Sequence, residues 1–279
     1  MQEYYFLFVL ALIWTFAAAI QDLKKREVAN WLNFSLIVFA FAYRAFYSIE
    51  NKNPQFFIYG LIGFVIFLAF GYACYYGKIF AGGDAKLLMG IGIIMPYENF
   101  SDFIILPIVF MFVLFLFGSL YSLIYSIGIV IKNKNKFSKE FTKKFRKNKY
   151  SISTASISAI VVPLIFHNPI AISSSILLLI PLLYVYTKSL EVCMVKLYPP
   201  EKLTEGDWLE KNVKIGNKTI RKTVHGLSKK EIEILKKYNK SVLIKEGIPF
   251  VPAFLIALIF MVLFFVTAKS FQELFFSLF

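Results

Sequence analysis

The sequence predicts an all-α polytopic membrane protein with about eight membrane segments, one of them short or re-entrant, and a small cytoplasmic α+β insertion. Hydrophobic residues make up 58% of the 279 residues, and aromatic residues, which suit lipid-facing surfaces and interfacial belts, make up 18%. Long apolar runs alternate with short charged loops. Only the stretch 188–247 is polar enough to form a water-soluble unit.

The N-terminal part, 1–131, is predicted to form the membrane core of the protein. Lys24, Lys25 and Arg26 follow the first apolar run, and basic residues at this place predict a cytoplasmic loop and an outer N-terminus. The first run is not a standard signal peptide, because it carries Glu3 and lacks a basic segment before it. The apolar runs of this part are 4–20, 31–49, 56–76, 85–95 and 103–131.

The rest of the chain is predicted to continue from the cytoplasmic side. A basic loop, 132–150, favours anionic lipid headgroups as its partners. The run 151–187 is too long for one ordinary span, so it is interpreted as a helical hairpin with an outer turn at His167. The small cytoplasmic domain, 188–247, should contain short strands and a helix with a capping box of Ser228 and Glu231. The last span and tail are 248–279.

The charge and the cysteine content limit the possible partners. The net charge is +14, but no recognisable nucleic-acid module accompanies the basic loops, so membrane lipid rather than nucleic acid is the expected partner. Cys74 and Cys193 lie far apart, and the two histidines, His167 and His225, are isolated. No spacing typical of metal ligands occurs, and the sequence predicts neither a metal nor another cofactor.

The tetrapeptide Ala81-Gly82-Gly83-Asp84 is the first candidate site. An ionisable residue at the edge of a membrane span is a functional candidate by default, and the glycines allow another segment to approach closely. The apolar run after Asp84 reaches only about 17 Å, against roughly 30 Å of hydrocarbon. Either this helix does not span, or the glycine loop enters the membrane from one side. Alternatively, Asp84 simply caps a helix that begins at Ala85.

Asp22, at the cytoplasmic end of the first span, is the second candidate. The predicted topology puts Asp22 and Asp84 on the same side of the membrane, at similar depth. Two carboxylates within a few ångströms of each other share one proton. One can then activate a water molecule while the other protonates a peptide carbonyl, which is the chemistry of an aspartic protease. Taken alone, Asp22 could equally be a charged partner of the basic residues that follow it.

These two segments resemble the signature motifs of prepilin peptidases. The stretch DLKKREVANWLN resembles the first motif, in which an aspartate precedes Val/Ile-Pro-Asn, and Asn30 matches its asparagine. The stretch AGGDAKLLMGIG resembles the second motif, G-x-G-D followed by a small residue and a lysine. Ala29 and Ala81 depart from the motif proline and the first motif glycine. The stretch IKEGIPFVPAFL also resembles archaeal members of the family.

The resemblance implies a membrane-embedded aspartic endopeptidase of the archaeal prepilin/preflagellin peptidase type. Asp22 and Asp84 correspond to the catalytic aspartates, and Gly82, Gly83, Asn30 and Lys86 to motif positions near the substrate. Its substrates would be pilin-like or archaellin precursors, each with a short basic leader before a hydrophobic helix. The active site of this multi-pass plasma-membrane protein would then face the cytoplasm.

Two other classes of protein use membrane aspartates. A presenilin-like intramembrane protease shares the glycine-aspartate motif, but its partner aspartate follows a tyrosine within a span, whereas Gln21 precedes Asp22 here. An ion or solute transporter is expected to carry ionisable groups near mid-membrane and interrupted helices in two related halves. The sequence contains no such repeat.

Overall fold

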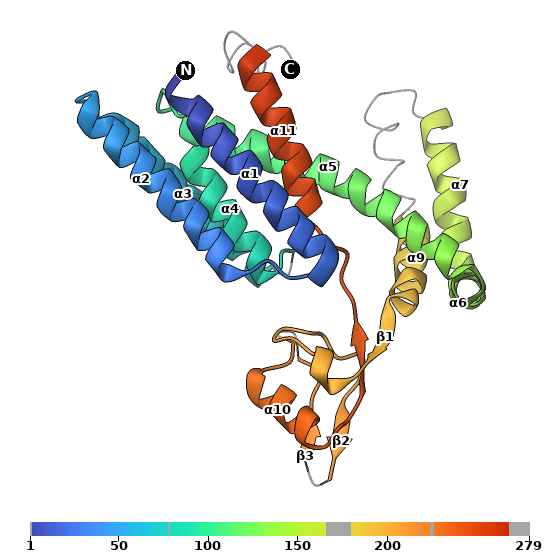
Figure 1. The fold of residues 1–279 in the computed structure, drawn as a ribbon. Helices are drawn as coiled ribbons and strands as arrows, with labels where there is room; N and C mark the ends of the chain where they lie inside the picture. Colours follow the sequence, from blue (N-terminus) through green and yellow to red (C-terminus); the bar gives the residue numbers. More distant parts are fainter. Residues whose placement is uncertain (1, 78, 166–179, 217, 224–225, 268–279) are drawn as a thin grey trace. The chain divides into compact units, whose positions relative to one another are not determined.

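The computed structural model describes residues 2–77, 79–165, 180–216, 218–223 and 226–267, most of which are helical (Figure 1). The chain divides into two compact units, and each is described here by itself. The helical unit consists of Met1–Leu123 and Ile248–Phe279, and the insertion unit consists of Ile124–Gly247.

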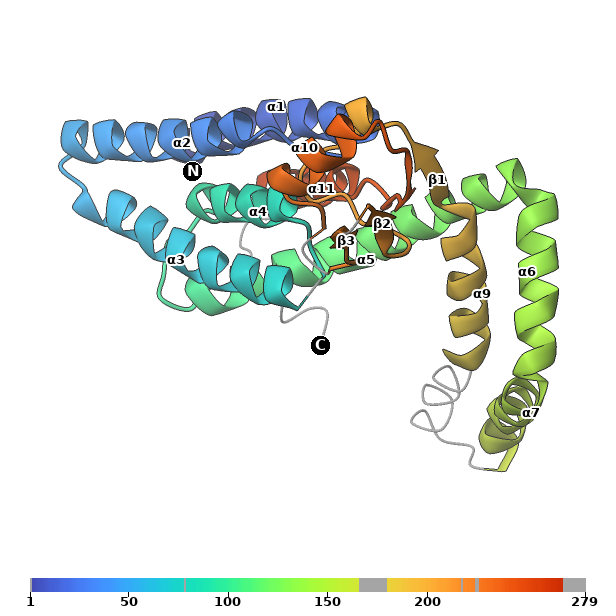
Figure 2. The ribbon, with the colours of Figure 1, turned by 90° about the horizontal axis from the view of Figure 1, so that it is seen from below.

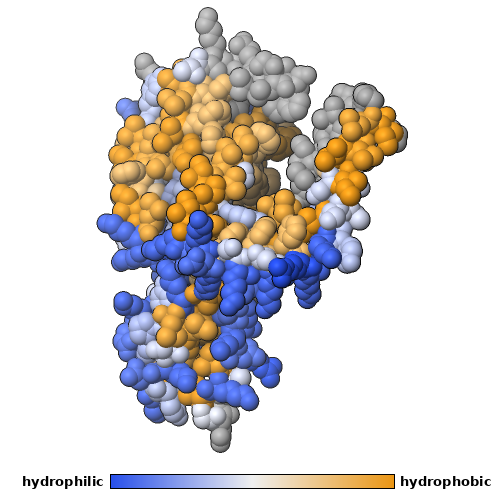
Figure 3. Space-filling view, turned by 90° about the vertical axis from the view of Figure 1, so that its right-hand side faces the viewer, coloured by the Kyte–Doolittle hydropathy of each residue, from blue (hydrophilic) through white to orange (hydrophobic). Residues whose placement is uncertain are grey.

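The helical unit is built from long apolar helices. Those long and apolar enough to cross a membrane, among the described residues, are α1, α2, α3 and α5, and α11 is a shorter apolar helix. The bounds are α1 Gln2–Lys25, α2 Asn30–Glu50, α3 Pro54–Tyr76, α4 Gly82–Ile94, α5 Asp102–Lys132 and α11 Val251–Thr267. Their outward surface is mostly hydrophobic on the face drawn in Figure 3, as lipid contact requires.

The short helix α4 is buried within the helical unit. It packs against α1, α2 and α3, and Figure 2 shows it beside α2 and α3. A Cβ atom on Gly63 of α3 would lie 2.5 Å from the Gly92 carbonyl oxygen of α4, so the two backbones meet through glycine. The predicted short fourth element is present, and its burial among α1, α2 and α3 explains how so short an apolar helix is accommodated. The glycines of the AGGD segment belong to this helix, which begins at Gly82 and not at Ala85.

Arg44, a residue that the sequence reading did not single out, closes the C-terminal end of α4. Its side chain is 0% exposed within α2. Its guanidinium donates to the carbonyl oxygens of Ile93 (2.7 Å), Phe56 (2.5 Å) and Met95 (2.9 Å). Carbonyl groups at a helix end have no partner within the helix, and inside a membrane they must find one in the protein. Arg44 therefore satisfies the end of a helix that does not reach water.

The insertion unit begins with the end of α5 and a set of shorter helices. Residues predicted as a basic loop, 132–150, are largely helical and form α6, Lys134–Lys147. This helix is amphipathic, because Phe137, Phe141 and Phe145 follow one another at four-residue intervals and stack in sequence. The two helices of the predicted hairpin are α7, Lys149–Ile165, and α9, Ile180–Cys193. The turn predicted at His167 lies outside the described residues.

The polar stretch forms a small α+β fold with its own core. Strands β1 (Val195–Tyr198) and β4 (Val242–Lys245) pair antiparallel, as do β2 (Val213–Ile215) and β3 (Lys218–Ile220). A short 3₁₀ turn, η1, covers Pro200–Lys202, and α10 covers Lys229–Lys237. The core residues are Leu203, Leu209, Ile215, Ile220, Leu227, Ile232, Leu235, Val242 and Ile244.

The helix of this fold begins as its sequence predicts. The Ser228 hydroxyl accepts the Glu231 N–H at 3.4 Å, and the Glu231 carboxylate accepts the Ser228 N–H at 2.9 Å. This reciprocal pair is the capping box expected of Ser-x-x-Glu. The predicted fold class, a helical polytopic membrane protein with a small α+β insertion, is confirmed.

Candidate active site

Asp22 lies in the last turn of α1, and the beginning of α11 holds its carboxylate. Its Oδ2 accepts the N–H of Val251, the first residue of α11, at 2.9 Å, and the N–H of Phe250 also interacts with it. The first N–H groups of a helix lack partners within the helix, and together they favour a negative charge. Arg26, four residues after Asp22, interacts electrostatically with the same carboxylate. Although Asp22 is only 6% exposed, it therefore has partners that suit an anion.

Asp84 lies in the first turn of α4 and reaches back to the start of its own helix. Its Oδ2 accepts the N–H of Ala81, the residue at the N-cap position, at 3.2 Å. The expectation that Asp84 caps a helix is thus correct in kind, but the helix begins three residues earlier than the predicted Ala85. Ala81 has φ −72° and ψ 164°, a conformation open to any residue, so the motif glycine is not required there.

The segment after α1 turns so that it can approach α4. Arg26 has φ +57°, a left-handed conformation that ends α1. Ala29, which stands where the motif has proline, has φ −63°, the angle that proline would fix. Its N–H, which proline would lack, is donated to the side-chain oxygen of Gln21 at 3.1 Å. The departure from the motif therefore preserves the local backbone shape and adds a hydrogen bond.

Three contacts join this segment and the first turn of α2 to the first turns of α4. A Cβ atom on Gly83 would lie 3.4 Å from the Cβ of Val28, so Val28 is in van der Waals contact with this position. Asn33 donates its side-chain N–H to the Gly83 carbonyl oxygen at 3.1 Å. Lys86 donates to the Asn30 side-chain oxygen at 2.6 Å. Both predicted motif segments thus meet through residues that the motifs contain.

The two glycines of the motif differ in their surroundings. A Cβ atom on Gly82 would meet only the ring of Tyr75, at 3.7 Å, which is an ordinary contact. Gly83, by contrast, has Val28 side-chain and backbone atoms on this side. A Cβ alone on Gly83 would be in van der Waals contact with Val28, so only a larger side chain would press on the Val28 backbone, whereas Gly82 has only the Tyr75 ring on this side.

Asn33 is a polar site residue that the sequence reading missed. It is 1% exposed, and its side-chain oxygen has no hydrogen-bond partner among the residues that the structure describes. The signal for it was an asparagine one turn after Asn30, inside an otherwise apolar helix. A buried amide oxygen without a hydrogen-bond partner costs free energy, so its presence here calls for an explanation such as a functional role.

The arrangement allows the two carboxylates to act on each other. The charge of Asp22 acts electrostatically on Asp84, and both side chains are buried, at 6% and 9% exposure. Two neighbouring carboxylates with little water around them do not both ionise readily, so such a pair holds one proton between them. A pair of carboxylates that shares one proton would offer one acid and one base, the two groups that an aspartic protease needs.

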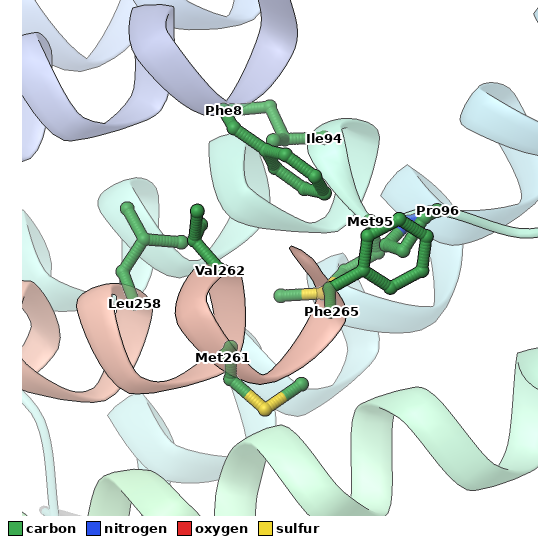
Figure 4. A pocket seen from close by; sticks show the side chains of 8 residues that line it. All are labelled: Phe8, Ile94, Met95, Pro96, Leu258, Met261, Val262 and Phe265. Carbon is green, nitrogen blue, oxygen red and sulfur yellow. The ribbon is translucent and has the colours of Figure 1, made fainter. Parts of the chain in front are cut away.

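No cluster of three metal-ligating residues occurs in the described part of the chain. Cys74 and Cys193 are both buried and free. The small apolar pocket of Figure 4, about 10 Å³ in volume, lies at the C-terminal end of α4, away from Asp84. It is therefore a packing gap between helices, not part of the carboxylate site. Its lining residues are Phe8, Ile94, Met95, Pro96, Leu258, Met261, Val262 and Phe265.

Comparison with known proteins bears on the same part of the chain. Residues 9–127 match the profile of the Type IV leader peptidase family, and this segment includes Asp22 and Asp84. The resemblance to prepilin and preflagellin peptidases is thereby confirmed. Helix α11, which holds Asp22, lies outside the matched segment.

Three curated relatives carry the name preflagellin peptidase. That of Methanocaldococcus jannaschii is 29% identical over 92 residues, covering 33% of this chain and 39% of the relative. That of Methanococcus maripaludis is 33% identical over 79 residues, covering 28% of this chain and 34% of the relative. That of Methanococcus voltae is 30% identical over 93 residues, covering 33% of this chain and 40% of the relative. The aligned part of the chain thus spans about two fifths or less of these relatives. No solved structure matches the chain.

Proposed function

We propose that this protein, whose residues 9–127 match the type IV leader peptidase family, is a membrane-embedded aspartic endopeptidase. It removes the short basic leader from prepilin- or prearchaellin-like precursors at the cytoplasmic face of the membrane. The observation that carries the proposal is the pair of buried, interacting carboxylates of Asp22 and Asp84, both inside the matched segment.

The pair can hydrolyse a peptide bond without an external base. In the first step one carboxylate takes a proton from water, and the water oxygen bonds to the scissile carbonyl carbon. The other, protonated carboxyl gives its proton to the carbonyl oxygen, which produces a tetrahedral diol. In the second step the carbon–nitrogen bond breaks while the first carboxyl protonates the leaving nitrogen. One diol hydroxyl returns a proton to the second carboxylate, and the starting state is restored.

The substrate class follows from the family resemblance and the names of the relatives. The precursor would enter with its hydrophobic helix in the membrane and its basic leader in the cytoplasm. The predicted cytoplasmic side carries Asp22 and Asp84, so the scissile bond at the membrane edge would reach them. The choice between pilin and archaellin precursors is a matter for direct comparison of substrates.

The test is cleavage of both precursors by the purified protein in proteoliposomes, with the shortened product identified by mass spectrometry. We expect the wild-type protein to cleave at least one precursor. Asp22→Asn and Asp84→Asn should each abolish cleavage almost completely, because each keeps the shape but removes the base or the shared proton. The double variant should lose little more, since groups that act as a unit are strongly non-additive.

Glu27→Gln is the matched control, because Glu27 is an exposed acid a few residues from Asp22 and should be dispensable. Glu246 is a poorer control, since its buried carboxylate contacts Lys196 at 2.9 Å and Tyr198 at 2.6 Å. Near-normal cleavage by Asp22→Asn would end the proposal. So would a wild-type protein that leaves both precursors uncut while a preflagellin peptidase cleaves its own precursor under the same conditions.

A further inference from the structure

Each aspartate accepts an N–H from a residue that directly follows a phenylalanine. Asp84 accepts the N–H of Ala81, which follows Phe80. Asp22 accepts the N–H of Val251, which follows Phe250. The rings of Phe80 and Phe250 are in contact, with their centroids 5.6 Å apart. The two holding segments, far apart in sequence, are therefore joined directly.

This contact belongs to an aromatic cluster that we define as Phe80, Phe115, Phe250 and Phe254. The ring centroid of Phe254, one turn into α11, lies 5.5 Å from that of Phe80 and 6.0 Å from that of Phe250. The ring centroid of Phe115, on α5, lies 6.0 Å from that of Phe80. Aromatic pairs at such distances contribute beyond the area they bury. The cluster fixes the start of α11 against both α5 and the segment before α4.

Helix α5 also provides the space for Phe250. A Cβ atom on Gly118 would lie 2.5 Å from the tip of the Phe250 ring, closer than real atoms approach. A residue larger than glycine at this position therefore requires the ring to move. Because Phe250 is adjacent to Val251, such a movement reaches the N–H that holds Asp22.

The partners of the two carboxylates are unequal. Asp22 has the N–H groups of Val251 and Phe250 and the positive charge of Arg26. Asp84 has the N–H of Ala81, while the ammonium group of Lys86, two residues on, donates a hydrogen bond to the side-chain oxygen of Asn30. From the other helices packed here, α11 has no acidic residue in its first turn, and α2 presents the uncharged amides of Asn30 and Asn33.

We propose that the N-terminus of α11, fixed by the Phe250 ring, positions Asp22 and selects it as the carboxylate that stays ionised and takes the proton from water. Asp84 then carries the shared proton and gives it to the scissile carbonyl oxygen. This assignment rests on the proposed function and adds a role for a segment outside the matched residues 9–127. Phe250 and Val251 are positioning residues, because they act through Asp22 and not on the substrate.

The test removes one N–H at a time and measures the pH dependence of precursor cleavage. Val251→Pro deletes the donor to Asp22 at the first helical position, where proline is well tolerated. Without this hydrogen bond Asp22 ionises less readily, so we expect the acidic limb of the profile to move to higher pH by about one unit. Val251→Ala keeps the N–H and is the matched control, with its acidic limb unchanged.

The reciprocal variant is Ala81→Pro, which deletes the donor to Asp84 at a residue whose φ of −72° suits proline. It should move the alkaline limb to higher pH and leave the acidic limb in place. Phe250→Leu should shift the acidic limb in the same direction as Val251→Pro, by a smaller amount. Its control is Phe260→Leu, which removes another contact between α11 and α5, with Phe117 at 5.4 Å, and should leave both limbs unchanged.

The pH profiles of these variants test the assignment of Asp22 as base and Asp84 as acid. An alkaline limb that moves in Val251→Pro assigns the roles the other way round and overturns the inference. The same holds if Val251→Pro and Val251→Ala have identical profiles, or, where the proline variant does not fold, if Phe250→Leu matches Phe260→Leu. In each of these cases the proposed function stands, because the wild-type protein still cleaves. Failure of the wild-type protein to cleave refutes the proposed function itself.

Discussion

At the scale of single residues, the site depends on the absence of a side chain as much as on its carboxylates. Gly83 lies under the segment that follows Asp22, with Val28 at 3.4 Å from the position of an added Cβ. Any branched side chain there pushes this segment away from α4. The distance between the two carboxylates should therefore respond to a substitution that changes neither of them.

We predict that Gly83→Val lowers kcat/KM for precursor cleavage on the order of 100-fold, because displacement of catalytic groups by about 1 Å has effects of this size. Gly82→Val is the matched control. Its nearest neighbour is Tyr75 at 3.7 Å, and it should keep most of the activity. Equal losses in the two variants would contradict a specific close approach at Gly83.

Sequence reasoning found the residues whose partners lie within the two motifs. Asn30 and Lys86 were singled out by the resemblance, and they contact each other at 2.6 Å. The reasoning noted the stretch that contains Val251 but missed its contact with Asp22, because this hydrogen bond joins residues 229 positions apart and uses a backbone N–H that any residue but proline has. It also missed Asn33, which lies within the first motif stretch but is not one of the positions that define the motif.

At the scale of elements, the helix α5 supports the site from outside it. Gly118 and Gly128 lie on this one helix, but only Gly118 faces another side chain, the Phe250 ring, and a Cβ on Gly128 would have no neighbour within 4 Å. Glycine within a helix is less favourable than alanine by about 1 kcal/mol. Alanine at either position should therefore stabilise the helix. A difference in stability or activity between the two alanine variants would report the contact of residue 118 with the Phe250 ring.

We predict that Gly118→Ala lowers precursor cleavage about tenfold, since a displaced Phe250 loosens the hold on Asp22. Gly128→Ala should leave cleavage unchanged and raise the melting temperature of the purified protein slightly. Cleavage rates and thermal unfolding in detergent, measured in parallel, check both statements. The prediction is wrong if Gly118→Ala cleaves at the wild-type rate.

The short helix α4 shows where element-level prediction ended. Its length predicted either a helix that does not span the membrane or a glycine loop that enters it, and its beginning was placed at Ala85 with Asp84 as the cap. The structure starts the helix at Gly82, where α4 packs among α1, α2 and α3 despite the low helix propensity of glycine. The hydrogen bonds from Arg44 to the carbonyl groups at the end of α4 could not be predicted either, because no sequence pattern near Ile94 indicates contact with α2.

At the scale of the whole molecule, composition alone was sufficient for the fold class. Apolar runs long enough to span a bilayer and a polar stretch with its own turn and capping signals leave few other architectures. The order of packing was not accessible in this way. Lipid-facing helices have similar apolar surfaces, so their pattern does not reveal that the last helix, α11, packs against the first, α1.

The predicted topology can be checked by cysteine labelling in a chain from which Cys74 and Cys193 have been removed. Single cysteines at Glu27, Lys143 and Lys230 should react with a membrane-impermeant reagent from the same side. A cysteine at Glu50 should react from the opposite side, because basic loops stay in the cytoplasm. Labelling of Lys143 and Lys230 from different sides would overturn the hairpin interpretation of residues 151–187.

The hydrogen bond between Asp22 and Val251 also has a consequence for the order of events during synthesis. Asp22 is synthesised before Lys86, and both motifs are complete once Lys86 has been made. Val251 follows far later, after the whole insertion unit has been translated. A nascent chain halted before α11 has both aspartates but lacks the group that orients the first of them. The proposed positioning of Asp22 by α11 therefore requires that the insertion unit has been translated first.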